Sequence, residues 1–459
     1  MTGAVSRARP WSVLLAAHPA RAVVLAFALV ILAGTALLAL PVASQEDAAT
    51  GVVTALFTST SAVCVTGLAV VDTGTYWSGF GQGVVLALIQ VGGFGIMTMA
   101  SLLALLVSGR LRLRMQLTAQ AETKSLGIGD VRRVLLGVAG TTLIVEVATG
   151  AVLALRFRFG YGENIGDAVY LGYFHAVSAF NNAGFGLHAD SITRYAQDAW
   201  VTVPIAVAVI LGGIGFPVLL EILRHRHRSR TTGRRNWTLH TKLTVLTTAV
   251  LLATGTVLTC LLEWTNPATL GPHPTAGKIL DGFFHSAMTR TAGFNAVDVG
   301  AMHASTLLMT CALMFIGGGS AGTAGGIKVT TFAVLAAAMA AEVRGEPTST
   351  MMGRRLAPHT LRQALTVALL SVGLVMGATL VLLTLTEHPL EKVLFEVVSA
   401  FATVGLSTGV TADLPTTGHL LLTALMFIGR LGPITLVSAL ALRERTRRYE
   451  LPEERPVIG

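Results

Sequence analysis

The stretch Asn181-Asn182-Ala183-Gly184-Phe185 decides the fold, because three related stretches lie at nearly even intervals from it. Each has a central glycine, a bulky apolar residue directly after the glycine, and a phenylalanine ten residues before it. The related stretches are Val65-Thr66-Gly67-Leu68, Thr291-Ala292-Gly293-Phe294 and Thr403-Val404-Gly405-Leu406. The intervals from Gly67 to Gly184, on to Gly293 and on to Gly405 are 117, 109 and 112 residues. This period indicates one structural unit used four times.

The composition places the chain among membrane proteins. Of its 459 residues 53% are hydrophobic and 12% are charged, and the mean hydropathy is +0.68. The net charge of +9 could suggest nucleic acid as a partner. However, the basic residues form short clusters between apolar runs, which is typical of membrane topology. The three cysteines have no CxxC spacing and indicate neither a disulfide framework nor a metal site.

Each unit is predicted to contain a long apolar helix, a half-length helix that ends at the glycine turn, and a second long segment. The first apolar run follows basic residues as a signal peptide would, but its spanning length favours a transmembrane helix. The last segment of the third unit is expected to be broken in its middle. Unit one covers 1–130 with helices at 22–40, 51–62 and 82–107, unit two covers 131–239 with helices at 131–155, 167–180 and 200–223, unit three covers 240–359 with helices at 240–262 and 276–288 and the broken segment 303–341, and unit four covers 360–459 with helices at 361–385, 390–401 and 417–442.

The distribution of charge predicts the topology. Basic residues gather at the junctions between units and at both ends of the chain, whereas a set of acidic residues that includes Glu163, Asp190 and Glu387 falls in the loops on the other side. Because cytoplasmic loops carry the excess of Lys and Arg, we expect eight membrane crossings with both termini in the cytoplasm. The chain is thus predicted to be a multi-pass cell membrane protein, and its arginine-rich, lysine-poor composition suggests a bacterium. The basic clusters also offer contacts for anionic lipid or a regulatory subunit.

The four glycine turns are predicted to form a pore. Non-helical backbone at membrane depth is tolerated only where protein or water satisfies its polar groups, so the turns should meet in one sheltered place. Glycine permits positive φ, and four such strands around an axis would present rings of carbonyl oxygens that can replace the water shell of a cation. The short helices would direct their partially negative C-terminal ends to the same place. The alternative is that the glycines are helix caps in an ordinary bundle.

Three stretches carry a more specific resemblance: SAFNNAGFG at 178–186, TRTAGFN at 289–295 and FATVGLSTG at 401–409. They resemble the KtrB/TrkH/HKT superfamily of potassium and sodium transporters, and the layout is closest to that of KtrB. The resemblance implies an all-α membrane protein with four helix–pore-helix–helix repeats around one pseudo-fourfold cation pore. It also implies K⁺ as the transported ion, no covalent cofactor, a homodimer, and a cytosolic nucleotide-binding regulatory ring of the KtrA/TrkA type.

The resemblance also assigns the carbonyls of a selectivity filter. They would come from Val65, Thr66 and Gly67, from Asn182, Ala183 and Gly184, from Thr291, Ala292 and Gly293, and from Thr403, Val404 and Gly405. In the family a serine in place of the first glycine is associated with a preference for Na⁺, so Gly67 favours K⁺. None of the strands reads TVGYG, the sequence of tetrameric K⁺ channels. Permeation by Na⁺, and Na⁺ as an activator or co-ion, therefore stay open.

A second register of glycines follows the turns by 24 to 28 residues. In the third unit it forms a run that cannot continue a helix, given a cost near 1 kcal/mol for each glycine, and we expect an intramembrane loop that gates the pore. A phosphate cradle is disfavoured because no strand precedes the run. Arg430 stands where the other units have glycine, and a charge at this depth costs about 2.5–17 kcal/mol unless it is compensated. The expected gate residues are Gly317, Gly318, Gly319, Ser320, Gly322, Gly325, Gly326, Lys328 and Arg430.

Two further ionisable residues, Arg290 and Glu146, have predicted structural roles. Arg290 should brace its filter strand from behind, with backbone carbonyls or Glu396 as partners. Glu146 is expected to be a buried, hydrogen-bonded or protonated carboxyl group.

Three other functions fit the sequence less well than ion transport. A carrier of organic solutes would need polar side chains at the midplane, and few are found there. An enzyme is disfavoured because neither HExxH nor GxSxG nor a pair of catalytic carboxylates occurs in the helices. A flux measurement would distinguish ion transport from the role of a non-conducting scaffold. The membrane potential, worth about 2.3 kcal/mol per charge per 100 mV, would drive uptake.

Overall fold

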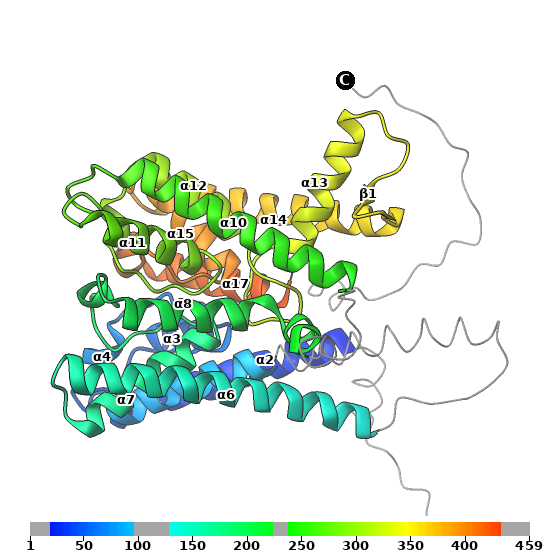
Figure 1. Cartoon of the computed structure of the whole chain (residues 1–459). Helices are drawn as coiled ribbons and strands as arrows, with labels where there is room; N and C mark the ends of the chain where they lie inside the picture. Colours follow the sequence, from blue (N-terminus) through cyan, green and yellow to red (C-terminus); the bar gives the residue numbers. More distant parts are fainter. Residues whose placement is uncertain (1–18, 96–127, 224–236, 433–459) are drawn as a thin grey trace, which may run out of the picture.

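The computed structural model describes residues 19–95, 128–223 and 237–432. In this part of the chain the structure is mostly helical, and it contains one two-stranded antiparallel hairpin. The long helices run side by side, and the short helices lie among them (Figure 1). The predicted all-α class agrees with this structure.

The first half of the chain contains two sets of elements in a similar order. The first set is α2 (Pro19–Leu38), η1 (Pro41–Ala43), α3 (Val52–Val63), α4 (Thr73–Tyr76) and the helix Gly79–Gly95. The second set is α6 (Ile128–Gly160), α7 (Ile165–Phe180), η2 (Thr193–Tyr195), α8 (Ala199–Ile214) and the helix Phe216–Leu223. The helix η1 of the first set has no counterpart among the described residues of the second.

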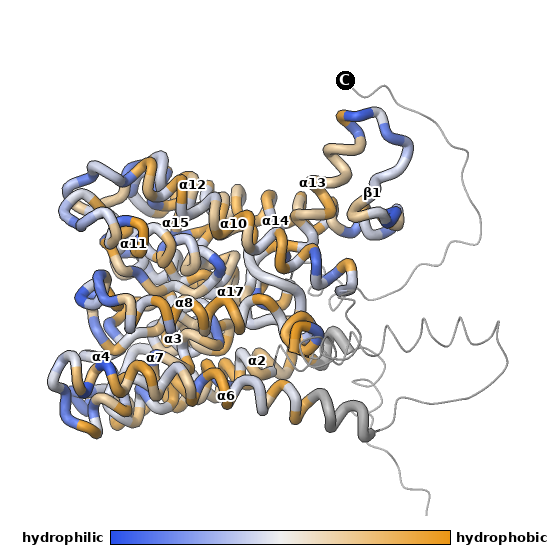
Figure 2. Tube along the Cα trace, in the orientation of Figure 1, coloured by the Kyte–Doolittle hydropathy of each residue, from blue (hydrophilic) through white to orange (hydrophobic). Residues whose placement is uncertain are grey.

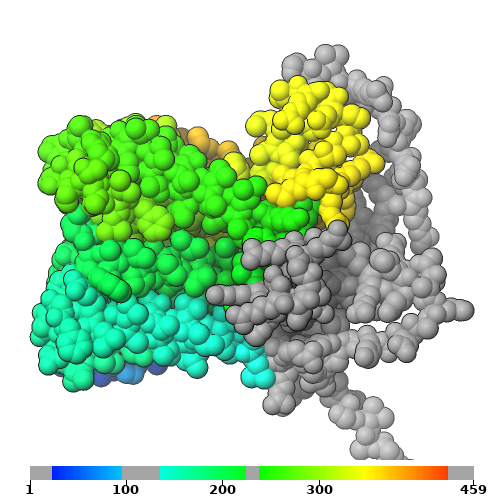
Figure 3. All heavy atoms as spheres, in the orientation of Figure 1, coloured from blue at the N-terminus to red at the C-terminus, as the bar shows by residue number. Residues whose placement is uncertain are grey.

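The second half repeats the order with one insertion. The third set is α10 (Leu239–Glu263), α11 (Thr275–Met288), η3 (Val299–Ala301), α12 (Ala304–Phe315) and α13 (Val329–Val343), and the hairpin β1 (Thr350–Met351) and β2 (Arg354–Arg355) follows it. The fourth set is α14 (Pro358–Leu385), α15 (Leu390–Ala402), α16 (Val410–Asp413) and α17 (Thr416–Leu431). The end of α13 and the hairpin project from the body of the molecule (Figures 1 and 3).

Local sequence explains where several helices begin. The side chain of Asn164 caps α7 by accepting a hydrogen bond from Asp167 N at 2.9 Å. Thr238 caps α10 in the same way. Proline, which lacks the amide hydrogen that the first turn of a helix leaves unpaired, occupies the first position of α14.

The helix predicted at 200–223 is wrong as one straight element. It is bent by 102° between Ile214 and Phe216, where Gly215 has φ +99°. A Cβ at this position would collide with Ser320 O, so the bend makes room for the backbone of the 317–326 loop. The break predicted within 303–341 is confirmed, because α12 ends at Phe315 and α13 begins at Val329. The predicted helices at 82–107 and 417–442 continue into residues outside the described ranges, as do most of the basic clusters.

The outside of the bundle is apolar. Within the described residues three helices are long and apolar enough to cross a membrane, namely Leu135–Gly160, Leu239–Glu263 and Pro358–Leu385, and α8 with Phe216–Leu223 makes a fourth if the bent pair is one span. Side chains such as Leu29, Ile144 and Leu261 are about two-thirds exposed or more. Hydrophobic residues follow the long helices, and hydrophilic ones gather at the loops (Figure 2). This surface suits lipid as its surroundings.

Candidate functional site

The four glycine turns share one backbone conformation. Each follows the C-terminal end of a short helix, α3, α7, α11 or α15. The residue two before each glycine also has positive φ, although it is not glycine. The φ values of these pairs are 55° and 92° for Val65 and Gly67, 58° and 71° for Asn182 and Gly184, 68° and 71° for Thr291 and Gly293, and 50° and 93° for Thr403 and Gly405. The positive φ of the glycines was predicted, whereas that of their non-glycine partners, which costs about 1–3 kcal/mol each, was not.

The four turns close a ring. A Cβ placed on Gly184 would lie 2.6 Å from Ala292 O, and one on Gly293 would lie 2.7 Å from Val404 O. A Cβ placed on Gly67 would likewise collide with Ala183 O, and one on Gly405 would collide with Thr66 O. Each glycine therefore meets a carbonyl of the next turn, in the order one, two, three, four and back to one. A side chain at any of these glycines would collide with that carbonyl.

The amide groups of the turns bond back to the short helices. Thr66 N, Ala183 N and Val404 N donate to the carbonyls of Ser61, Ser178 and Ser399 at 2.7–2.8 Å. Because these N–H groups are satisfied behind the ring, the backbone carbonyls are the groups left to face a ligand.

A cavity of about 310 Å³ lies over the ring. All four ring glycines line it, together with polar residues of the loops that follow the turns, including Asp72, Ser191, Asn295 and Ser407. The short helices point their C-terminal ends, which carry partial negative charge, at the ring below this cavity. The arrangement favours a cation over an anion.

On the other side of the ring, the glycine-rich run 317–326 forms a loop held by the bent end of α8. Gly319 N donates to Gly213 O at 2.8 Å, and Thr323 N donates to Gly212 O at 3.1 Å. Phe216 N, just past the bend, donates to Ala321 O at 3.2 Å. The glycines of the second unit thus serve as a support for this loop.

Two contacts join the loop to the ring. Thr323 Oγ1 donates to Asn182 Oδ1 at 2.7 Å, and Gly325 N donates to Thr291 Oγ1 at 3.1 Å. All of these side chains are fully buried. The predicted loop therefore lies directly against the predicted filter residues.

Two cationic side chains hold successive carbonyls of the loop. Arg430 Nη1 donates to Thr323 O, and Lys328 Nζ donates to Ala324 O at 2.6 Å. Arg430 is 7% exposed, and its Nε and Nη2 have no hydrogen-bond partner among the described residues. The expected contact between Arg430 and the loop is present. Its role as a barrier to ions stays a prediction.

Arg290 was predicted to support its filter strand from behind through bonds to backbone carbonyls or to Glu396, and the structure has the bonds to carbonyls. Its guanidinium donates to Ile316 O at 3.0 Å and to Leu313 O at 3.1 Å, and so holds the end of α12 behind the third turn. Glu396 is not its partner. The Glu396 carboxylate instead accepts bonds from Thr408 N at 2.7 Å and Thr411 Oγ1 at 2.5 Å, within the loop that follows the fourth turn.

Glu146 is hydrogen-bonded, as expected. Its carboxylate accepts from Asn181 Nδ2 at 3.0 Å and Gln90 Nε2 at 3.3 Å, which joins α6 to the C-terminal end of α7.

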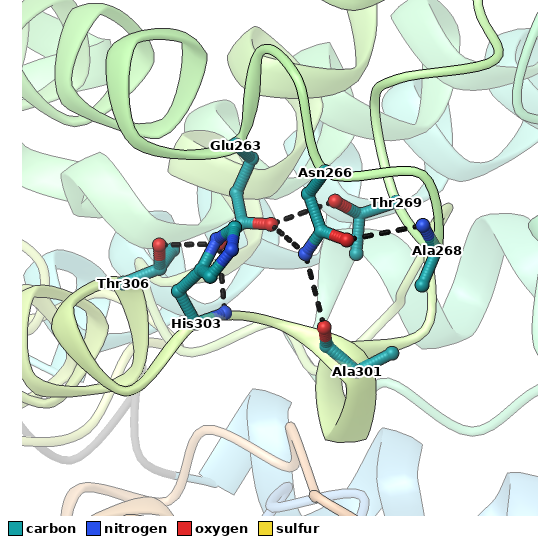
Figure 4. A network of polar contacts seen from close by, with 7 residues as sticks. All are labelled: Glu263, Asn266, Ala268, Thr269, Ala301, His303 and Thr306. Atoms are coloured by element: carbon teal, nitrogen blue, oxygen red, sulfur yellow. Dashed lines mark hydrogen bonds and ion pairs between the residues drawn. The ribbon is translucent and has the colours of Figure 1, made fainter.

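A further buried carboxylate, Glu263, has a structural role that was not predicted from the sequence. It lies at the end of α10 between the loop that follows this helix and the start of α12 (Figure 4). Asn266 and Thr269 donate to one of its oxygens, and His303 N and Thr306 donate to the other. Its position at a helix end and the nearby hydroxyl residues were the available signals, but its partners are up to 43 residues away.

The fold and this site define an integral membrane protein of the cation-transporting class. The family model TrkH, described as a cation transport protein, matches residues 4–447, and the chain belongs to this family. It is 38% identical over 432 residues to the Ktr system potassium uptake protein B of Bacillus subtilis (strain 168), covering 94% of this chain and 95% of that protein. It is 33% identical to the potassium/sodium uptake protein NtpJ of Enterococcus hirae, covering 96% and 97%. The crystal structure of the potassium transporter TrkH from Vibrio parahaemolyticus has the same fold, with a TM-score of 0.71 at 18% identity over 92% of this chain and 84% of that chain.

Proposed function

We propose that this chain takes up K⁺ across a bacterial cell membrane, down the electrochemical gradient of the ion, through the ring of four glycine turns. The observation that carries the proposal is the closed ring, in which each glycine meets a carbonyl of the next turn. Two relatives named as potassium uptake proteins, which match nearly the whole chain at 38% and 39% identity, support K⁺ as the ion.

The ion would bind to the backbone carbonyls of the ring. These are the twelve predicted filter residues at 65–67, 182–184, 291–293 and 403–405. Gly67 at the first turn favours K⁺ over Na⁺. Because the relative NtpJ is named a potassium/sodium uptake protein, Na⁺ as a second permeant, activating or coupled ion belongs to the same proposal.

The proposed architecture has four units, with boundaries near residues 130, 239 and 359, and eight membrane crossings with both termini in the cytoplasm. The repeated order of a long helix, a short helix with a turn, and a further long segment supports it. We further propose a homodimer that works with a cytosolic nucleotide-binding ring. The names of the Ktr relatives, which describe a multi-component system, are consistent with such a partner.

The gate would be the loop 317–326 with Lys328 and Arg430. The two cations hold adjacent carbonyls of the loop on the side of the ring away from the cavity. A positive charge close to the ion path repels a permeating cation, and the low-dielectric surroundings strengthen this effect. Uptake would then require the loop and its cations to move.

The test is growth of a K⁺-uptake-deficient bacterium on low K⁺. The wild-type chain, expressed with a Ktr-type regulatory subunit, should restore growth, and Gly184→Ser and Gly184→Asp should not, because a side chain at this position collides with the next turn. Gly373→Ser is the matched control, since Gly373 lies in α14 with open space around its Cβ position. If Gly184→Ser restores growth as well as the control, the ring is not the K⁺ pathway. If the wild-type protein reaches the membrane without restoring growth, Na⁺ flux into vesicles decides between a Na⁺ pathway and no pathway.

A further inference from the structure

The four turns of the ring are not held in the same way. In the first and fourth turns, the glycine N–H donates to a serine of its own short helix. Gly67 N bonds to Ser61 Oγ at 3.0 Å, and Gly405 N bonds to Ser399 Oγ at 3.1 Å. These two turns therefore carry an internal restraint that comes from their own unit.

The second and third turns lack this restraint. The corresponding residue of the third unit is Ala287, which has no hydroxyl group. In the second unit it is Ser178, whose hydroxyl is buried and has no hydrogen-bond partner among the described residues. These are the same two turns that bond to the loop, through Asn182 and Thr291.

The bond to Asn182 restrains a conformation that the backbone disfavours. Asn182 has φ +58°, and its side chain is held at both ends, with Nδ2 donating to Arg290 O at 3.1 Å and Oδ1 accepting from Thr323 Oγ1 at 2.7 Å. The Thr323 hydroxyl also lies 3.3 Å from Phe180 O at the end of α7. If the loop withdrew, Oδ1 would lose this donor and the side chain of Asn182 would be held at one end only.

We propose that the loop is a structural part of the filter as well as its plug, and that Thr323 and Gly325 position the second and third turns. Selectivity then depends on the position of the loop. With the loop in place each turn has a further restraint beyond its bond back to the short helix, and with the loop withdrawn only the first and fourth turns keep one from a serine hydroxyl of their own unit. Withdrawal would therefore raise flux and lower the discrimination between K⁺ and Na⁺ together. This inference rests on the proposed function of the ring as an ion filter.

The experiment measures K⁺ and Na⁺ flux with the full chain and its regulatory subunit in lipid vesicles. Thr323→Val removes the hydroxyl and keeps the shape of the side chain, whereas Thr323→Ser keeps the hydroxyl. Thr379→Val is a matched control, because the hydroxyl of Thr379 is buried in α14 and donates within its own helix, to Val375 O at 2.8 Å. Thr323→Ala removes the same hydroxyl with a smaller side chain and gives the same test if the valine variant does not fold.

We expect the K⁺/Na⁺ flux ratio to fall roughly three- to tenfold in Thr323→Val, as the loss of one buried hydrogen bond allows. It should stay near the wild-type value in Thr323→Ser and Thr379→Val. An unchanged ratio with increased K⁺ flux would mean that the loop only plugs the pathway, and it would overturn the inference while leaving the proposed function intact. No flux of either ion through the wild-type protein would instead refute the proposed function, and this inference with it.

Discussion

Replacing Glu263 by glutamine should destabilise the protein, because both oxygens of this carboxylate accept hydrogen bonds from obligate donors. One oxygen accepts from Asn266 Nδ2 at 2.6 Å and the other from His303 N at 2.9 Å. A glutamine must turn its NH₂ group toward either Asn266 Nδ2 or His303 N. Two donors would then face each other, and neither would have an acceptor. The threonine hydroxyls of the network can rotate, but an amide N–H cannot.

The magnitude follows from this geometry. A buried donor left without an acceptor costs about 1–3 kcal/mol, and the remaining bonds lose the strength that the charge gives them, so a total near 3 kcal/mol is expected. At about 2 cal/mol/K of unfolding entropy per residue, this lowers the melting temperature of a 459-residue chain by about 3 °C. Glu263→Ala should cost more, because it leaves all four donors unpaired and adds a cavity.

The assay is thermal unfolding of the purified protein in detergent, followed by tryptophan fluorescence. The matched control is Glu387→Gln, which makes the same chemical change at an exposed position. The control should melt within about 1 °C of the wild type on the same entropy scale. If Glu263→Gln melts with the control, the network does not hold α10 to α12 and the reasoning is wrong.

Three further substitutions give separate tests. Arg430→Ala should speed K⁺ uptake or lower the apparent KM by removing the charge and its bond to Thr323 O, and wild-type kinetics would exclude a barrier role. Glu396→Gln should slow uptake and lower the melting temperature, because Thr408 N loses a charged acceptor; an effect on stability alone would make Glu396 a purely structural residue. Gly215→Ala should cost about 1–2 kcal/mol or more of unfolding free energy, since φ is +99° and its Cβ would meet Ser320 O, and a melting temperature equal to that of Gly373→Ala would contradict this.

Much of the helical framework could be predicted from the sequence. The short helices were predicted at 51–62, 167–180, 276–288 and 390–401, within about two residues of α3, α7, α11 and α15. They were accessible because apolar runs, capping residues and the glycine after each helix are local signals. The break between α12 and α13 was predictable for the same reason, since several glycines within ten residues exclude a helix whatever surrounds them.

The features that were missed depend on distant parts of the chain. The glycines at 212, 213 and 215 are compatible with either helix packing or a kink, and the sequence does not show that the bend at Gly215 lies against Ser320 O of the 317–326 loop, about a hundred residues further on. Backbone carbonyls are the partners of Arg290, as one of the two predicted alternatives had it, whereas Glu396, the other alternative, is bonded within its own unit, because proximity between units cannot be computed from spacing within them. The positive φ of Val65, Asn182, Thr291 and Thr403 was missed because packing holds these residues where their own preferences would not.

The closed ring consists of four turns from one chain, and no two of these turns have the same sequence. In an assembly of four identical chains, one codon change alters every turn at once. In this chain one codon change alters one of the four turns and leaves the other three unchanged. Variation at this site can therefore proceed in small, graded steps, and the effects of substitutions in different turns can be combined or set against one another within a single gene.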